Sequence, residues 1–167
     1  TEVEYNVANC ITRGALENPI CASYLNHPER LNEISIFVED PVSGLMLKTR
    51  PDLMIESEQT VYDVKTTQDA SPNGFLKECL KYGYFLQGAH YAYTCKLAGY
   101  DIKTFSFIAC EKTAPYVSHL HVMGSDIMRW GMNQLHKTLA TIAKAEKDSN
   151  YGTDWGDYTV MEKPSWL

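Results

Sequence analysis

Apolar residues near the start of the chain recur every three or four positions, which is the spacing of one face of a helix. The repeat predicts a helix over residues 3–16, and its apolar positions are Val3, Val7, Cys10, Ile11 and Ala15. Asn18 followed by Pro19 is typical of a helix N-cap with proline at the first helical position. A short second helix is therefore expected over residues 19–27.

The hydrophobic period becomes that of β-strands after residue 32. Residues 33–55 contain two β-rich runs, joined by the sequence DPVSG at residues 40–44, where Pro and Gly favour a hairpin turn. A third run, TVYDVKTT at residues 60–67, follows a polar break at residues 57–59. The simplest interpretation is a meander of three antiparallel strands.

The second half of the chain has the pattern of a helix, two strands and another helix. The predicted elements are a helix at residues 71–99, strands at 102–111 and 116–123, and a helix at 124–147. Ser71 with Pro72 is the expected start of the first of these helices and Gly99 its expected end, while Ser125 is the expected N-cap of the second. The order of elements predicts one mixed α/β domain over residues 1–167.

Composition narrows the class of protein. A chain of 167 residues with 44% hydrophobic residues is typical of one soluble globular domain, and no apolar run approaches the length of a membrane span. The five cysteines are scattered and form no CxxC pair, which favours reduced thiols in a cytoplasm over disulfides or a zinc ribbon. The formal net charge of −6 argues mildly against a nucleic-acid binder, although carboxylates that hold metal ions also contribute negative charge.

Charged residues interrupt the predicted sheet. Glu33 opens the first predicted strand, Asp52 ends the second, and Asp63 and Lys65 lie on the third. Because strand side chains alternate, Asp63 and Lys65 are expected on the same face, with Val64 turned into the core behind them. Carboxylates suit a hard cation such as Mg²⁺, and a neighbouring ammonium can orient water or stabilise a phosphoryl oxygen. Spacing alone fits equally well a solvated strand pair with an aspartate at a turn.

The wording of these motifs resembles the PD-(D/E)XK nuclease superfamily, with RPD ending at Asp52 and DVKTT beginning at Asp63. The chain is most similar to the phage and prophage recombination exonucleases of the exonuclease VIII type. Their DPETG-like hairpin matches residues 40–44, and their PSW near the C-terminus matches residues 164–166. Lambda exonuclease resembles it more distantly, with a glutamate that corresponds to Glu33.

The resemblance implies a restriction-endonuclease-like core, in which helices flank a mixed central sheet. It implies that Asp52, Asp63 and the carbonyl of Val64 hold Mg²⁺, for which Mn²⁺ can substitute, and that Glu33 is an outer or second-metal ligand. It also implies that Lys65 orients the attacking water.

Gln87 and Tyr91 are four residues apart and so share a helix face. They match the Q-x-x-x-Y motif that RecB-type nucleases place beside the catalytic strand, which implies a role in supporting the metal site or holding DNA. Periodicity alone favours Tyr91 as a core residue and Gln87 as a surface residue.

The activity implied is that of a Mg²⁺-dependent exonuclease that degrades one strand of linear duplex DNA, 5′ to 3′, in phage-type homologous recombination. Duplex DNA ends, a single-strand annealing protein and a trimeric or tetrameric ring are the implied partners, in the cytoplasm of a bacterial host or phage-infected cell and away from membranes. The aromatic tail at residues 151–167 is expected either to make subunit contacts or to fold back on its own core.

Two alternatives stay open at this point. The first is an endonuclease or a Cas4-like nuclease on the same core, for which circular DNA would also be a substrate. The second is a non-catalytic DNA-binding or assembly module with a vestigial site, against which the intact Asp52, Asp63 and Lys65 argue.

One motif of the family is missing from the sequence. Neither an iron-sulfur cluster nor a histidine-bound soft metal is expected. Relatives carry an upstream histidine in a G-T-x-x-H helix; His27 does not match it, so either the N-terminal part that carries it is lacking or Glu33 suffices. No cysteine follows Cys110, so no iron-sulfur cluster is expected. His119 and His121 have the spacing of a soft-metal pair, but no third nitrogen or sulfur ligand is near in sequence.

Overall fold

A five-stranded sheet with the order β1-β4-β5-β6-β7 forms the centre of the computed structural model, which describes residues 1–152 and 160–163. Its strands are β1 (Leu31–Asn32), β4 (Leu53–Ile55), β5 (Thr60–Thr67), β6 (Thr104–Glu111) and β7 (Ser118–Val122). β5 and β6 are parallel and the other pairs are antiparallel, so the sheet is mixed, as predicted. The PSW motif at residues 164–166, and with it most of the aromatic tail, lies outside the described residues.

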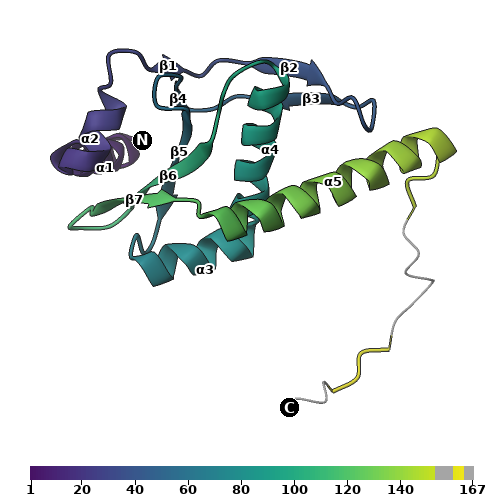
Figure 1. Cartoon of the computed structure of the whole chain (residues 1–167). Coiled ribbons are helices and arrows are strands. Elements are labelled where there is room, and N and C mark those ends of the chain that lie inside the picture. Colours follow the sequence, from purple (N-terminus) through teal and green to yellow (C-terminus); the bar gives the residue numbers. More distant parts are fainter. Residues whose placement is uncertain (153–159, 164–167) are drawn as a thin grey trace.

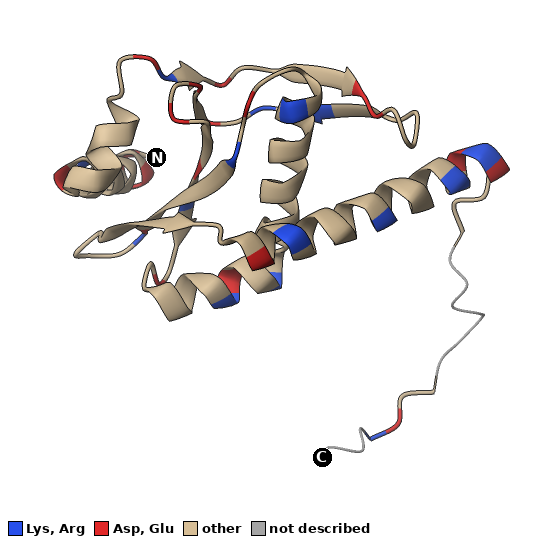
Figure 2. Ribbon diagram, in the orientation of Figure 1, with Lys and Arg blue, Asp and Glu red and all other residues tan. Residues whose placement is uncertain are grey.

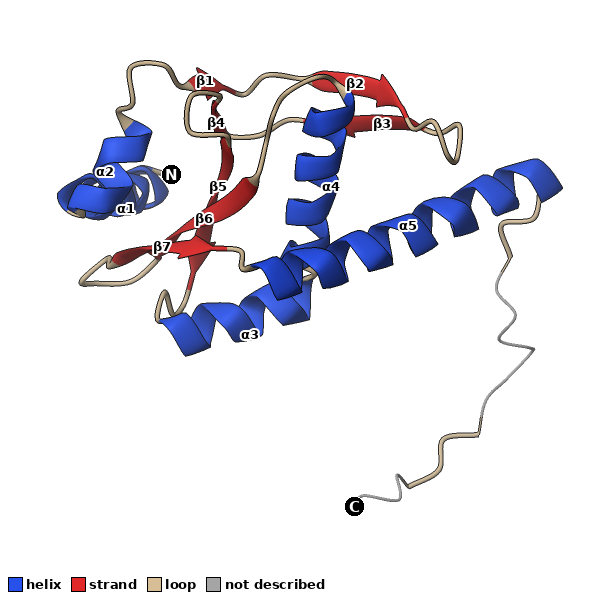
Figure 3. Ribbon diagram, in the orientation of Figure 1, coloured by secondary structure: helices blue, strands red, loops and turns tan. Residues whose placement is uncertain are grey.

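Helices cover both faces of this sheet (Figures 1 and 3). On one face lie α1 (Glu2–Glu17) and α2 (Pro19–Leu25), whose apolar residues pack with Leu53, Tyr62 and Ile108. On the other lie α3 (Pro72–Tyr82), α4 (Tyr84–Leu97) and α5 (Ser125–Asp148). None of the described helices is both long enough and apolar enough to cross a membrane. The predicted order of elements and the flanked sheet are thus confirmed.

The predicted three-stranded meander is wrong in part. The hairpin at residues 40–44 joins β2 (Ile36–Glu39) to β3 (Met46–Thr49), but these two strands form a separate sheet. The chain leaves that sheet at Pro51, which has no N–H to donate to a continuing ladder, and re-enters the central sheet as β4. The antiparallel pairing of β4 with β5 is as expected.

The predicted helix over residues 71–99 is divided in two at Gly83, whose φ of 71° ends α3 in the left-handed region. Glycine adopts this conformation without a steric penalty, and the turn gives α3 and α4 different directions (Figure 1). The predicted start is correct, because the Ser71 hydroxyl accepts a hydrogen bond from the backbone N–H of Gly74 at 3.2 Å. In α5 the N-cap is Gly124, one residue before the expected Ser125.

A buried aspartate fixes the β2–β3 hairpin to α4. Asp40 is 1% exposed and accepts hydrogen bonds from the Ser43 N–H at 2.9 Å, from the Ser43 hydroxyl, and from the Tyr93 hydroxyl at 2.6 Å. Burial by itself raises the pKa of this carboxyl, but the hydrogen bonds from Ser43 and Tyr93 outweigh burial and hold the pKa below its ordinary value. The carboxylate therefore ties the hairpin to the helix while it is ionised.

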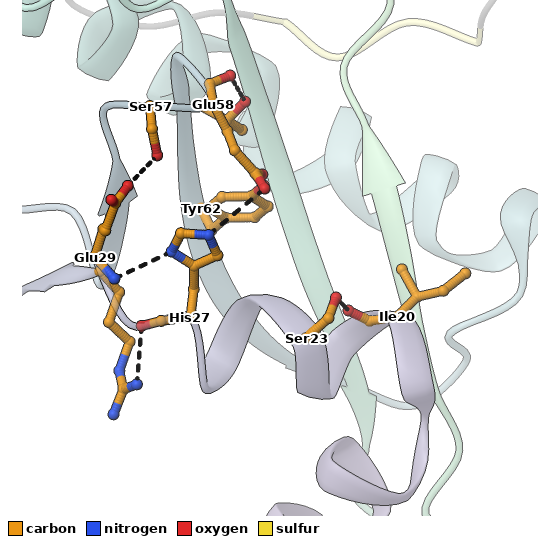
Figure 4. Close-up of polar contacts among 9 residues, drawn as sticks. Ile20, Ser23, His27, Glu29, Ser57, Glu58 and Tyr62 are labelled. Carbon is orange, nitrogen blue, oxygen red and sulfur yellow. Dashed lines mark hydrogen bonds and ion pairs between the residues drawn. The ribbon is translucent and has the colours of Figure 1, made fainter.

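A second polar cluster fastens α2 and the loop after it to the turn between β4 and β5 (Figure 4). The Tyr62 hydroxyl donates to Glu58 at 3.1 Å, and the His27 Nε2 lies 3.8 Å from the same carboxylate. The Ser57 hydroxyl donates to Glu29 at 2.5 Å. Because Tyr62 precedes Asp63 on β5, these contacts hold the strand from the face opposite Asp63.

Replacing Tyr93 with Phe should lower the free energy of unfolding by about 1.5–3 kcal/mol at neutral pH, because the hydroxyl donates to a charged acceptor. A carboxyl with a lowered pKa stabilises the fold above the unfolded-state pKa, about 3.9, and that stabilisation is lost as pH falls through the folded-state pKa. The cost of Tyr93→Phe should therefore shrink in acid, which urea unfolding at a series of pH values measures. Tyr5→Phe, on exposed α1, is the matched control and should have little effect at any pH.

Candidate active site

Asp63 and Lys65 form an ion pair on the face of β5 that is covered by α3 and α4. The Lys65 Nζ lies 2.6 Å from the Asp63 Oδ2, with 5% of the aspartate side chain exposed and 21% of the lysine side chain. This contact confirms that the two side chains share a face, as strand alternation predicts. The pair therefore combines a buried acid with a cation that solvent still reaches.

Val64 does not lie in the core, so the prediction that its side chain turns into the core is wrong. The side chain is 38% exposed, although the neighbouring Tyr62 on the same face of β5 is buried. Helices α1 and α2 pack over Tyr62, Ile108 and Cys110, and this layer does not extend over Val64. The face of β5 that carries Tyr62 is therefore open to solvent at Val64.

Asp52 lies beside the strand edge where the β4–β5 ladder ends. The last paired residues are Leu53 and Tyr62, and the Asp52 Oδ2 then accepts a hydrogen bond from the Val64 N–H at 2.7 Å. In an antiparallel ladder the N–H and C=O of one residue leave the strand on the same side, so the Val64 carbonyl faces this edge too. The Asp52 carboxylate and the Val64 carbonyl thus lie at one edge of β5, next to Asp63.

Burial dominates the electrostatics of Asp63. It raises the pKa of the carboxyl, and the ion pair with Lys65 and the hydrogen bond from Gln87 reduce this rise without cancelling it, while the charge of Asp52 adds to it. The Gln87 Nε2 donates to the Asp63 Oδ1 at 2.7 Å. Within the described part of the chain, the Asp63 Oδ2 has no hydrogen-bond partner besides its ion pair with Lys65. One buried oxygen therefore retains acceptor capacity.

Tyr84 lies under the lysine. The Lys65 Nζ is 4.9 Å from the centre of the Tyr84 ring, at a distance where a cation and an aromatic face attract. Tyr84 begins α4, and its ring packs 5.8 Å from that of Phe107 on β6. Sequence analysis gives no sign of this contact, because it depends on the break between α3 and α4 at Gly83.

Glu33 and Tyr91 occupy different surroundings from the ion pair. Glu33 follows β1, and its carboxylate pairs with the Arg50 guanidinium at 2.8 Å on the surface. The Glu33 backbone N–H is nevertheless 3.1 Å from the Pro51 carbonyl oxygen. The backbone of Glu33 therefore lies close in space to that of Asp52. The Tyr91 ring packs edge-on against Phe105, at 5.9 Å between ring centres, as part of the core beneath β6.

A groove of about 670 Å³ opens beside Gln87, between the β2–β3 hairpin, α4 and α5. Leucines of all three elements line it, together with Lys48, Gln87 and His90. Ligand sites are usually concave and mostly apolar with a few polar groups. Gln87 therefore links this groove to the Asp63 carboxylate.

The donors at this site suit a hard cation. Asp52, Asp63 and the Val64 carbonyl are all oxygen donors, and Mg²⁺ binds through one or two carboxylates while keeping several waters. In residues 1–152 and 160–163, no three His, Cys, Asp or Glu side chains are gathered as a metal cage, so Glu33 is not part of such a group. His121 is stacked on Phe75 at 4.5 Å, and its Nε2 lies 3.1 Å from the Ala70 carbonyl oxygen, so these contacts give His121 a packing role.

Comparison with known proteins supports the fold. The model of a family described as a PDDEXK-like domain of unknown function (DUF3799) matches residues 7–158. A "Putative exonuclease" from Eubacterium rectale superimposes with a TM-score of 0.70 and 14% identity, over 97% of this chain and 63% of that chain. The chain thus spans less than two thirds of that protein.

Further comparisons show little likeness. An alkaline exonuclease from Laribacter hongkongensis aligns with a TM-score of 0.38 and 15% identity, over 83% of this chain and 73% of that one. No curated protein sequence matches the chain. The expected restriction-endonuclease-like core is confirmed by the family match and by the first superposition.

Asp63→Asn should stabilise the metal-free protein, and the gain should grow with pH. A carboxyl whose folded-state pKa is raised loses stability as pH rises from the unfolded-state value, about 3.9, through the folded-state value, whereas an amide does not titrate. Millimolar Mg²⁺ or Mn²⁺ should raise the melting temperature of the native protein by mass action but not that of Asp63→Asn.

Thermal unfolding with and without each metal, across a pH series, checks both parts of this expectation. Asp101→Asn, at a surface aspartate paired with Lys103, is the matched control and should keep the metal response. If neither metal changes the melting temperature of the native protein, Asp52 and Asp63 do not form a metal site.

Proposed function

The chain belongs to the PDDEXK-like domain family, and from this premise we propose that it is a Mg²⁺-dependent DNA exonuclease. The observation that carries the proposal is the buried Asp63, paired with Lys65 at 2.6 Å, held by Gln87 at 2.7 Å and adjoining Asp52 at the end of a ladder. Such a combination of carboxylates and a cation is suited to phosphodiester hydrolysis.

Asp52, Asp63 and the Val64 carbonyl would hold the metal, with Glu33 as an outer ligand. When bound, Mg²⁺ neutralises charge on the phosphate and activates water. The chain's own contribution is to keep Asp63 ready for this role: Gln87 fixes one carboxylate oxygen, which leaves the other for Lys65 or a cation. The raised pKa of Asp63 falls when a cation approaches, because an opposite charge favours the ionised form.

Lys65 would act on the attacking water and on the phosphoryl oxygens. Its ammonium is held between the Asp63 carboxylate and the Tyr84 ring, so little reorganisation is needed when charge develops on the phosphate. With Asp63 engaged as a metal ligand, the Lys65 ammonium would be available to hydrogen-bond the water or an oxygen of the phosphate. Gln87 supports the site from α4, as the Q-x-x-x-Y resemblance implies, whereas Tyr91 packs in the core against Phe105.

The residues of the site support phosphodiester hydrolysis in general. Three further features support an exonuclease in particular. They are the order of the RPD and DVKTT motifs, the DPVSG hairpin at residues 40–44, and the superposition on a protein named as an exonuclease. The proposed substrate is one strand of linear duplex DNA, degraded 5′ to 3′ during phage-type recombination, with a single-strand annealing protein as partner in the bacterial cytoplasm.

A ring of three or four subunits would let an acidic protein stay on DNA. The net charge is −6, and Figure 2 shows lysines and arginines spread along α5 and several other elements, beside Asp and Glu residues. A closed cyclic assembly can replace surface affinity with enclosure of the duplex. The same enclosure would make cleavage depend on a free DNA end.

Lys65→Ala should lower kcat by about 10²–10³, the usual loss when one electrostatic group is removed, and should change the DNA dissociation constant little. Lys103→Ala, at an exposed lysine directly before β6 that pairs with Asp101, is the matched control and should retain full turnover. Steady-state cleavage of end-labelled duplex, alongside binding in the presence of Ca²⁺, measures the two constants. A Lys65→Ala enzyme with the native kcat would refute the assigned role.

Linear duplex should be degraded in a Mg²⁺-dependent manner while covalently closed circular DNA of the same sequence stays intact. Label placed at the 5′ end should be released before label at the 3′ end. Light scattering on the intact protein should give the mass of three or four subunits. Cleavage of the circle would favour the endonuclease alternative, and a monomer that still degrades long DNA processively would exclude the ring. Binding without any cleavage would favour the non-catalytic module.

A further inference from the structure

Two neighbouring aromatic rings, with an ammonium group at each end, form a row that leads from the ion pair to the surface. The Lys65 Nζ lies 4.9 Å from the centre of the Tyr84 ring, and the Tyr84 ring lies 5.7 Å from that of Tyr82. The Lys81 Nζ then lies 5.0 Å from the centre of the Tyr82 ring. The row therefore begins at the Asp63–Lys65 pair and ends on exposed groups.

The two tyrosines differ in how they are held. Tyr84 packs between Phe75 and Phe107, with ring centres 6.1 and 5.8 Å away, so it is anchored in the core. Tyr82 is 56% exposed, which leaves much of its ring to solvent. Both flank Gly83, whose φ of 71° ends one helix and starts the next, so Tyr82 is carried by regular structure and not by a long loop.

We propose that Tyr82 and Lys81 form a stacking subsite for an unpaired base of the DNA strand that enters the active site. This inference rests on the proposed function and deepens it. Proteins bind single strands by stacking successive bases on aromatic side chains, beside cations that track the phosphates. A base would take the place of the Lys81 ammonium over the Tyr82 ring, and the displaced ammonium would pair with the adjoining phosphate.

A nucleic-acid strand fits this surface better than a protein partner does. Leu76 and Leu80 on α3 are also exposed, at 46% and 48%, and by themselves they would suit an apolar partner. The outer end of the row, however, carries a ring with a cation over it, and its inner end is the ammonium next to the acid proposed to bind metal. An exposed ring with a cation beside it suits a base and its neighbouring phosphate, whereas a purely apolar partner would gain nothing from the ammonium.

The test uses a single-stranded oligonucleotide with 2-aminopurine near its 5′ end, bound to the whole chain in EDTA so that no cleavage occurs. Stacking on Tyr82 quenches the fluorescence, and Tyr82→Phe should preserve both the quenching and the affinity. Tyr82→Leu keeps an apolar side chain without a π face, and should abolish the quenching and weaken binding about 5- to 150-fold. Tyr5→Leu, at an exposed tyrosine of α1, is the matched control and should bind as the native protein does.

Salt dependence gives an independent reading on Lys81. Lys81→Ala should reduce the slope of log affinity against log salt by about 0.7, which is the value for one phosphate contact on a single strand. Unchanged affinity and quenching in Tyr82→Leu would overturn the subsite. It would also be overturned if Tyr82→Leu weakened binding of a protein ligand but left binding of the oligonucleotide unchanged.

The readout separates this inference from the proposed function, because it needs no turnover. A native protein that never cleaves DNA, but whose quenching depends on Tyr82, would retain the subsite and lose the nuclease. A native protein that cleaves linear DNA, and whose Tyr82→Leu variant has native KM and native quenching, would retain the nuclease and lose the subsite.

Discussion

The structure is organised around a carboxylate that is buried beside an ammonium near the middle of β5. Taking Asp63 out of water costs several kcal/mol, and only a close counter-charge and good hydrogen bonds offset such a cost. Lys65 provides the counter-charge from the same strand, and Gln87 provides a hydrogen bond from α4. Whatever keeps α4 against β5 therefore also keeps this hydrogen bond to the buried carboxylate.

Three features of the fold meet that requirement. Gly83 turns the chain so that α4 starts with Tyr84 under the lysine, and Asp40 ties the hairpin to Tyr93 on the same helix. On the opposite face, the hydrogen bond between Tyr62 and Glu58 holds β5 one residue before the acid. The polar site is supported from both sides of the sheet.

Local geometry explains which features could be predicted from sequence. Strand alternation places Asp63 and Lys65 on one face whatever surrounds them, and the RPD and DVKTT motifs are recognisable without a structure. The exposure of Val64 depends on how far the α1–α2 layer reaches, which no periodicity contains. The break at Gly83 is likewise hidden, because a glycine inside a helical pattern is often tolerated. The turn of Glu33 toward Arg50 depends on a pairing between separate elements.

The parallel pairing of β5 with β6 has a consequence for how the protein folds. Asp63 lies opposite Phe107, and the whole of α3 and α4 separates these two residues in sequence. Pairings across such long separations form late, because the entropy of closing the intervening loop has to be overcome first. A chain still on the ribosome that ends before β6 already contains Asp52, Asp63, Lys65 and Gln87, but not the strand that completes their sheet. Synthesis of β6 is therefore the step after which β5 can pair on both of its edges and the sheet around Asp63 can form.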